Sequence, residues 1–316
     1  MRVTEEQRRL LALCAIRTEQ GSVDWSLIAR EAQFPDGVDA LWRGRVQETG
    51  ASAESARAAL RHGLGRSEDL FRRVDQELVA AEAVGAKLIT VLDQGYPANL
   101  RLIPNLPPFL FVRGEILEDD ARSVAVVGTR NPSELGIGRA QKMTERLVAH
   151  GVTVISGLAR GIDAAAHRTA LASGGRTLAV LGTGITRCYP PQHQDLAEEI
   201  SRQGALVSQF WPTRPPGKDT FPRRNVVTSG LSQGTVVIEA TRTSGAKMQA
   251  RLALEHGKKV FLVTSLVTDQ PWAAGYVRKR GAIEVTNVDE VLEQLASPER
   301  VRQVAEQRQQ LSLALL

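Results

Sequence analysis

The chain has 316 residues, of which 42% are hydrophobic and 24% charged, a composition that supports a sizeable core and excludes extensive disorder. Aromatic residues make up only 4%, which argues against the broad stacking surface of an RNA-recognition domain. The net charge of +5 is uneven: residues 1–85 carry 12 basic and 14 acidic side chains, and the remainder carries 28 basic and 21 acidic ones. An anionic partner is therefore expected to bind the C-terminal part.

Cysteine usage and hydropathy indicate the cellular compartment. Cys14 and Cys188 lie far apart and lack a second ligand at metal-binding spacing, so neither a disulfide framework nor a zinc site is expected. No apolar run approaches the roughly 20 residues of a membrane span, and the N-terminus is too charged for a signal peptide. These features predict a cytoplasmic protein with no membrane segment, and we expect no metal and no cofactor.

Residues 1–85 predict a small all-helical domain. Apolar residues recur at helical spacing over 10–16 and 25–28, and Ala- and Arg-rich helical segments follow at 51–60 and 68–84. The break at residues 63–65 resembles the turn of a helix-hairpin-helix, although a plain turn between helices is the simpler interpretation. The domain is expected to be SAM- or helix-hairpin-helix-like.

Residues 86–296 predict an α/β domain. Four prolines between residues 97 and 108 require an extended connector, and a short strand is expected over 110–112. Apolar runs then alternate with helical stretches, which is typical of a Rossmann-like, doubly wound, mostly parallel sheet. The expected strands are 123–128, 153–156, 178–182, 205–209, 236–239, 260–263 and 283–285, with helices at 136–150, 161–173, 192–203, 246–256 and 287–296. Residues 297–316 are expected to form a C-terminal tail, as a short helix or a frayed end.

Small residues follow four of the expected strands, all at the same edge of the sheet. In an open α/β sheet, ligands bind outside the carboxyl ends of the strands, where helix N-termini point backbone N–H groups outward. Glycine lets a phosphate approach that backbone closely, so these strand ends predict a phosphate or nucleotide pocket. Its expected residues are Gly128, Thr129, Gly157, Arg160, Gly161, Gly182, Gly184, Ser244 and Gly245.

The motifs of common nucleotide enzymes do not occur in the sequence. There is no G-x-G-x-x-G after the first strand, no P-loop and no nucleophile elbow, so we expect no enzyme. Asp163 and His167 lie four residues apart and could form an acid–base pair, but a hydrogen bond that holds the helix start is the preferred interpretation. Glu239 is either a catalytic carboxylate or a polar side chain that fixes loop amides.

The segment 213–225 combines cations with one aromatic ring, and its sequence T-R-P-P-G-K-D-T-F-P-R-R-N predicts a Pro/Gly-rich loop. Basic side chains neutralise phosphates while an aromatic ring stacks on a base, the combination expected for single-stranded nucleic acid. A solvated basic loop whose phenylalanine anchors in the core explains the spacing equally well. The cations and the ring are Arg214, Lys218, Phe221, Arg223 and Arg224.

Taken in order, these motifs resemble those of the DNA-processing protein A family (DprA, also called Smf). The similarity runs from about residue 85 to 295 and extends loosely over the N-terminal helices. The matching motifs are Tyr96-Pro97, Pro107-Pro108-Phe109-Leu110, Gly128-Thr129-Arg130, residues 156–163 with His167, residues 180–184 with Tyr189-Pro190, residues 221–225, Gly230-Leu231-Ser232, Glu239-Ala240 and Ser244-Gly245.

The resemblance implies a cytoplasmic mediator that binds single-stranded DNA in a positive pocket at this sheet edge. It also implies that the protein loads a RecA-type recombinase during natural transformation and forms a homodimer through the Rossmann-like domain. By resemblance, Arg130 and Arg224 would clamp phosphate, and Lys218 would add charge. Phe221 would stack on a base or shape the wall of the pocket. The residues expected to contact nucleic acid are Arg130, Lys218, Phe221, Arg223, Arg224, Asn225 and Lys247.

The chain departs from the family pattern at several positions. Val226 replaces a usual arginine, which predicts weaker phosphate binding, and Lys247 is expected to restore charge nearby. Further departures are Gln209, Thr264 and Tyr276, and the C-terminal winged-helix domain of many members is not expected. A divergent paralogue fits the same motifs, as a nucleotide sensor or nucleotide-processing enzyme in a role such as phage defence. A scaffold acting through the N-terminal helices also stays open.

Overall fold

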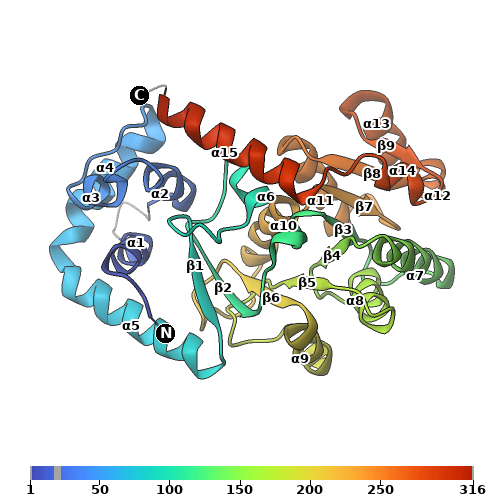
Figure 1. The fold of residues 1–316 in the computed structure, drawn as a ribbon, viewed down its shortest axis with the longest axis horizontal. Coiled ribbons are helices and arrows are strands. Elements are labelled where there is room, and N and C mark those ends of the chain that lie inside the picture. The colour runs from blue at the N-terminus through green and yellow to red at the C-terminus, as the bar shows by residue number, and fades with distance from the viewer. Residues whose placement is uncertain (1, 18–22, 315–316) are drawn as a thin grey trace.

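A computed structural model describes residues 2–17 and 23–314 (Figure 1). The strands of this described part form one nine-stranded sheet in the spatial order β1-β2-β6-β5-β4-β3-β7-β8-β9. Their bounds are β1 (Lys87–Thr90), β2 (Phe109–Gly114), β3 (Ser123–Val127), β4 (Thr153–Ser156), β5 (Thr177–Val180), β6 (Ala205–Ser208), β7 (Gly234–Val237), β8 (Lys259–Val263) and β9 (Ile283–Val285).

Parallel pairing dominates the sheet, as the sequence predicts. The strands from β3 to β9 pair in parallel, whereas β2 pairs antiparallel with both β1 and β6. Every strand expected after residue 123 is present, with its ends shifted by at most two residues. β1 was not predicted, because its four residues are only partly buried and give no continuous apolar run.

Helices flank the sheet on both faces and form the N-terminal region. The N-terminal helices are α1 (Glu5–Ala15), α2 (Trp25–Glu31), α3 (Gly37–Trp42), α4 (Ala51–Gly63) and α5 (Ser67–Ala83). The later ones are α6 (Ala98–Arg101), α7 (Glu134–Ala149), α8 (Ile162–Ala172), α9 (Gln194–Gln203), α10 (Thr220–Leu231), α11 (Gly245–Glu255), α12 (Thr264–Asp269), α13 (Pro271–Arg280), α14 (Asp289–Leu292) and α15 (Pro298–Ala314). Short 3-10 turns occur at η1 (Leu64–Arg66), η2 (Glu118–Ala121) and η3 (Pro191–His193).

The segment predicted as a loop over 213–225 is partly helical, so that prediction is wrong from Thr220 onward. α10 begins at Thr220 and contains Phe221 to Asn225. Pro222 is the third residue of this helix. The first four N–H groups of a helix have no acceptor within it, so a proline in this turn breaks no hydrogen bond. The start of α10 therefore carries Phe221, Arg223 and Arg224 at fixed angles around a helix, whereas Arg214 and Lys218 lie in the loop before it.

The strands β3 to β7 are buried on both faces, which explains their continuous apolar runs. Val124 and Val126 of β3 pack in one buried cluster with Ala140 and Leu147 of α7. The alternate residue, Ala125, belongs to the buried cluster on the opposite face. Helices α7 and α8 thus cover one face of the sheet, while α10 and α11 cover the other (Figure 1).

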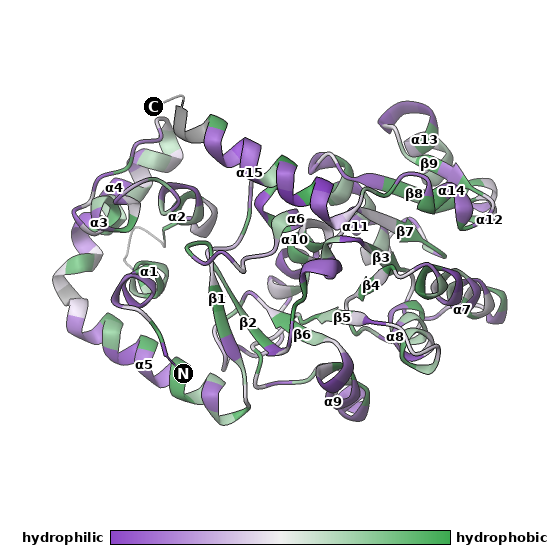
Figure 2. Cartoon of the chain, viewed as in Figure 1, coloured by the Kyte–Doolittle hydropathy of each residue, from purple (hydrophilic) through white to green (hydrophobic). Residues whose placement is uncertain are grey.

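The N-terminal helices share a core with the sheet edge. Leu10 and Leu27 belong to the same buried cluster as Phe109 of β2. The rings of Trp25 and Phe109 lie 4.9 Å apart, and Trp25 lies 6.2 Å from Trp211. Hydrophilic and hydrophobic residues alternate along α5, whose apolar side faces this cluster (Figure 2). The predicted boundary near residue 85 follows α5, and the division of the chain into two domains there stays a prediction.

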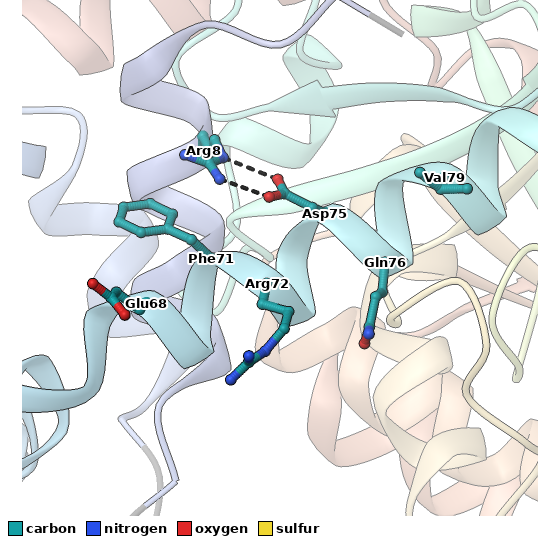
Figure 3. Close-up of a pocket in the computed structure, with 7 residues that line it drawn as sticks. All are labelled: Arg8, Glu68, Phe71, Arg72, Asp75, Gln76 and Val79. Atoms are coloured by element: carbon teal, nitrogen blue, oxygen red, sulfur yellow. Dashed lines mark hydrogen bonds and ion pairs between the residues drawn. The ribbon is translucent and has the colours of Figure 1, made fainter.

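An ion pair holds α5 against α1 (Figure 3). Arg8 donates to both carboxylate oxygens of Asp75, at 3.0 Å from Nε and 2.6 Å from Nη2, and its guanidinium carbon lies 4.4 Å from the centre of the Phe71 ring. These residues line an open groove that ends at the exposed Val79. Since Arg8 and Asp75 are partly exposed, the pair orients the helix more than it stabilises the fold.

The C-terminal segment is a full helix and not the short or frayed end that was one expectation. α15 packs against α6 and runs back toward the N-terminal helices (Figure 1). No helix of the described residues combines the length and apolar character needed to cross a lipid bilayer. Nor does any group of three His, Cys, Asp or Glu side chains gather within residues 2–17 and 23–314 as a metal site would require.

Candidate nucleic-acid interface

Two adjoining cavities open at the predicted sheet edge. The main cavity, of about 380 Å³, lies between the loops after β3 and β4 and the first turns of α10 and α11. The side cavity, of about 240 Å³, lies between the loop after β4, residues 189–192 and α10. The residues common to both walls are Arg130, Gly157, Ala159, Phe221 and Arg224. These shared residues form a partition between the two cavities.

An exposed cation and two aromatic rings stand at this partition. The Arg130 guanidinium carbon lies 5.6 Å from the centre of the Phe221 ring, and the Tyr189 ring centre is 5.6 Å from that of Phe221. Arg130 forms no ion pair with a carboxylate of the described residues. The arrangement therefore presents an uncompensated positive charge next to a half-buried aromatic face.

Glycines in the strand-end loops make room for these side chains. A Cβ at Gly182 would lie 2.6 Å from Cδ1 of Phe221, so the ring rests directly on the backbone after β5. A Cβ at Gly157 would overlap the guanidinium of Arg224. Gly184 faces away from both cavities, since its Cβ would lie 2.1 Å from the carbonyl oxygen of Pro212. Gly182 thus leaves room for the Phe221 ring, and Gly157 leaves room for the Arg224 guanidinium. At both glycines a protein side chain occupies the space in which the sequence predicted a phosphate.

Arg224 is buried and holds the partition together. Its Nη1 donates to the carbonyl oxygens of Gly157 and Val180, and its Nε donates to Oδ1 of Asn225 at 3.1 Å. Burial lowers the pKa of this guanidinium, while the nearby Asp163 carboxylate favours its charged form. Only Nη2 makes no hydrogen bond within the described chain. The main role of Arg224 is therefore to hold the backbone at Gly157 and Val180 in place, and its remaining nitrogen, Nη2, is available for a phosphate.

The acidic residues at this edge stabilise loops and do not form a catalytic pair. Asp163 accepts hydrogen bonds from the amides of Gly157 at 3.2 Å and Ala159 at 3.4 Å. Burial raises the pKa of Asp163, and the charge of Arg224 opposes that rise. His167 bonds Thr177 instead of Asp163, with Nδ1 at 2.7 Å from the hydroxyl oxygen. The preferred interpretation of Asp163 as a helix-start residue is confirmed.

Glu239 also fixes a loop, as one of its two interpretations predicts. Its Oε2 accepts a hydrogen bond from the Ser133 hydroxyl at 2.7 Å, and its carbonyl oxygen accepts one from the Thr129 amide at 2.7 Å. Ser133 in turn caps α7 by accepting from the Gly136 amide at 3.0 Å. These contacts hold the backbone of the loop that carries Arg130.

Arg223 and Arg224 are consecutive in the sequence, but the helical geometry of α10 directs their side chains to different sides of the helix. Successive residues are about 100° apart around a helix, so Phe221, Arg224 and Asn225 share one face. All three line the main cavity. Arg223 points to the opposite side, where its guanidinium carbon lies 4.9 Å from the Trp25 ring centre and 5.4 Å from that of Phe210. Arg223 is therefore not part of either cavity wall.

The other predicted residues divide between the cavities and their surroundings. The walls include Gly128, Thr129, Ser244 and Gly245 in the main cavity and the exposed Arg160 in the side cavity. Lys218 is exposed in the loop before α10 and lines neither cavity. Lys247 turns away, with Nζ 5.7 Å from the Trp272 ring centre. Gly161 starts α8 with a φ of +77° beneath the Thr129 backbone.

Several residues in the walls of the main and side cavities were not predicted from the sequence. Thr228 lies two turns after Phe221 on the same face of α10, and recognising that helix would have predicted it. The other main-cavity residues depend on how α11 packs, for which the sequence carries no local signal. The missed residues are Thr228, Thr241, Thr243, Met248 and Gln249 in the main cavity and Tyr189, Pro190, Pro191 and Gln192 in the side cavity.

Four positions that depart from the family pattern lie away from the main cavity, whereas the departure at residues 246–249 places Met248 and Gln249 in its wall. Val226 faces the same side of α10 as Arg223. Gln209 is buried and donates to the Arg223 carbonyl oxygen. Tyr276 packs against Trp272 with ring centres 5.2 Å apart. Thr264 donates to the Val285 carbonyl oxygen at 3.3 Å. None of the four therefore alters the walls around Arg130 and Phe221.

Comparison with known proteins agrees with the sequence motifs. Residues 87–296 match the family model of DNA recombination-mediator protein A. Protein Smf of Escherichia coli is 40% identical over 227 residues, which are 71% of this chain and 60% of that protein. DNA processing protein DprA of Bacillus subtilis is 33% identical over 242 residues, covering 76% of this chain and 80% of that protein.

The fold agrees as well. The X-ray structure of DNA processing protein A from Streptococcus pneumoniae matches with a TM-score of 0.70 and 26% identity, covering 94% of this chain and 99% of that one. The match includes the N-terminal helices, which the family model leaves out. By sequence over most of its length and by fold over nearly all of it, the chain belongs to the DNA recombination-mediator protein A family.

Proposed function

We propose that this protein binds single-stranded DNA at the partition between the main and side cavities and acts as a recombination mediator. The observation that carries the proposal is the exposed Arg130 beside the Phe221 ring, between two cavities that open at one sheet edge. A structure of DNA processing protein A from Helicobacter pylori, with the same fold at a TM-score of 0.60 and 22% identity, is described by its single-stranded DNA binding mode. Membership of the family extends the proposal to loading of a RecA-type recombinase, a homodimer and a cytoplasmic location.

The proposed binding mode follows from the chemistry of the walls. A phosphate bound by Arg130 and Nη2 of Arg224 would also meet the amides at the start of α11, where Ser244 and Gly245 line the main cavity. A base flanking that phosphate would stack on Phe221, which requires an unpaired strand because a duplex keeps its bases stacked internally. No side chain in this mode performs acid, base or nucleophilic chemistry, so the function is binding and not catalysis.

Single-stranded DNA is expected to bind with a clear dependence on salt. Each phosphate neutralised by a cation contributes a slope of about −0.7 to the logarithm of the association constant against that of salt concentration. The one phosphate between Arg130 and Arg224 predicts a slope of about −0.7, and each further phosphate contact makes the slope more negative by the same amount. Titration of a labelled strand over a salt series measures it, and a duplex of the same sequence is the control, expected to bind more weakly. A flat salt response, or a duplex that binds as tightly, would contradict the proposal.

A nucleotide sensor is the second candidate, because the main cavity is of small-molecule size. Its volume of about 380 Å³ falls in the range of ligand sites, roughly 300 to 1,000 Å³. A nucleoside monophosphate at 100 times its dissociation constant would stabilise the fold by about 2.7 kcal/mol, which thermal unfolding detects. If this candidate is right, the melting temperature rises with the monophosphate while single-strand binding is absent or salt-independent.

A further inference from the structure

A third cavity lies on the opposite side of α10 from the main cavity. This seam cavity, of about 330 Å³, is bounded by the N-terminal helices, the connector before β2 and the outer face of α10. Its walls include Arg17 and Trp25 from the N-terminal region, Asn105 from the connector, and Arg223 and Val226 from α10. The seam cavity thus joins the two parts of the chain at the helix that carries Phe221.

Two arginines and the Asp24 carboxylate line the seam cavity, so its described walls carry a net positive charge. Neither Arg17 nor Arg223 has a carboxylate partner at ion-pair distance in the part of the chain that the structure describes. Asp219 pairs with Arg214 at 2.8 Å, and Asp24, which lies in the cavity wall, accepts a hydrogen bond from the Ser26 amide at 2.9 Å. Burial lowers the pKa of both guanidinium groups. Repulsion from Arg73 lowers the pKa of Arg17 further, whereas for Arg223 the attraction of Asp219 opposes the lowering and repulsion from Arg17 adds to it. An anion in the seam cavity would relieve this repulsion.

A buried acceptor without a donor lies in the same cavity. Oδ1 of Asn105 is buried and makes no hydrogen bond to any described residue. A buried carbonyl oxygen without a partner is unfavourable, and a ligand N–H would satisfy it. The seam cavity therefore combines two groups that attract an anion with one that attracts a donor. A free phosphate meets only the first requirement, whereas a nucleotide meets both, because its base carries amino or imino N–H groups on its Watson–Crick edge.

We propose that the seam cavity binds a second nucleotide of the same DNA strand, with its phosphate between Arg17 and Arg223 and its base donating to Oδ1 of Asn105. This inference rests on the proposed function and extends its site across α10. A helix with its side chains is about 10–12 Å across, so a strand passing over the first turn of α10 reaches both cavities. The exposed Lys218, two residues before that helix, lies beside such a path. The N-terminal helices thereby become part of the binding site.

The test compares strand lengths in a variant that alters only the seam cavity. Arg17→Gln combined with Asn105→Leu removes one cation and the acceptor while keeping similar side-chain sizes. For a strand of about 16 nucleotides, we expect about tenfold weaker binding and a salt slope that is less negative by about 0.7. For a strand of about 2 nucleotides, which is too short to cross the roughly 10–12 Å of α10 and therefore occupies the main cavity alone, the affinity is expected to stay unchanged.

Matched variants separate this proposal from other effects. Arg61→Gln removes an exposed arginine of α4 that lines none of these cavities and is expected to leave both affinities unchanged. Arg17→Lys keeps the charge and is expected to retain the wild-type slope on the long strand, with an unchanged melting temperature as evidence of folding.

The proposal is overturned if the double variant keeps the wild-type slope on the long strand, or if Arg61→Gln lowers that slope equally. An equal loss on both strand lengths overturns it as well. Failure of the proposed function looks different: the wild-type protein then binds neither strand.

Discussion

Combined Arg130→Gln and Phe221→Ala substitution is expected to weaken single-strand binding by about a hundredfold. Loss of a stacking ring costs about 1–3 kcal/mol per base, and loss of a charged hydrogen bond to phosphate costs a similar amount. Because about 1.4 kcal/mol corresponds to a factor of ten, the two losses together reach two orders of magnitude. Equilibrium titration of a labelled strand at fixed low salt measures the effect.

The two single substitutions are expected to be non-additive. The Arg130 guanidinium lies over the Phe221 ring, so removal of either side chain also changes how the other meets the strand. A double-mutant cycle measures this coupling. Arg139→Gln, which removes an exposed arginine of α7 outside both cavities, is the control and is expected to bind as the wild type does. Unchanged affinity in the double variant would mean that DNA binds elsewhere on the molecule.

Acid is expected to destabilise the fold through His167. Its ring is fully buried, and burial lowers its pKa from about 6.5 to about 3, with the charges of His193, Arg224 and Arg168 adding to the effect. The Thr177 hydroxyl donates to the Val154 carbonyl oxygen at 2.8 Å, so its oxygen accepts from Nδ1 of His167. Nε2 is therefore the unprotonated nitrogen, and it is buried without a hydrogen-bond partner among the described residues. Protonation would place a charge and an unpaired N–H in the core.

The direction of the pH effect follows from the lowered pKa. Above about pH 6.5, His167 is neutral in both the folded and unfolded states, and its contribution to stability is complete. As the pH falls from about 6.5 toward 3, only the unfolded state binds the proton, so the free energy of unfolding decreases by about 1.4 kcal/mol per pH unit. The loss between pH 6.5 and 5 is therefore about 2 kcal/mol.

Urea denaturation of the wild type and of His167→Gln at both pH values isolates this term. The variant is expected to lose about 2 kcal/mol less than the wild type over this interval. His256, whose pKa burial lowers to about 4, adds to the slope of both proteins and cancels in the comparison. His62→Gln, at an exposed position on α4, serves as the matched control. Equal pH slopes in wild type and His167→Gln would exclude His167 as the source.

Local patterns were enough to predict the framework of the sheet and the edge at which the cavities open. The run at 123–127 is apolar because helices cover both faces of β3. Such a run can be recognised in the sequence without knowing which helices cover it. The glycines at 128 and 157 follow their strands directly, and a mostly parallel sheet brings such ends to one edge. Both inferences depend on neighbours in sequence or on the general geometry of parallel sheets.

The roles of individual side chains were decided by tertiary packing. Arg223 and Arg224 are adjacent arginines in the sequence. The guanidinium of Arg223 lies over the Trp25 ring beside the N-terminal helices, whereas Arg224 is buried at the partition between the cavities. Their separation requires α10, whose start was hidden by a proline in its first turn.

By itself, the sequence determined the fold class, the family and the sheet edge that bears the cavities. Which cation faces which cavity, and whether it meets a ligand or a carbonyl oxygen, depends on contacts between residues far apart in the chain. Periodicity records how much of a side chain is buried, but not which distant residues bury it.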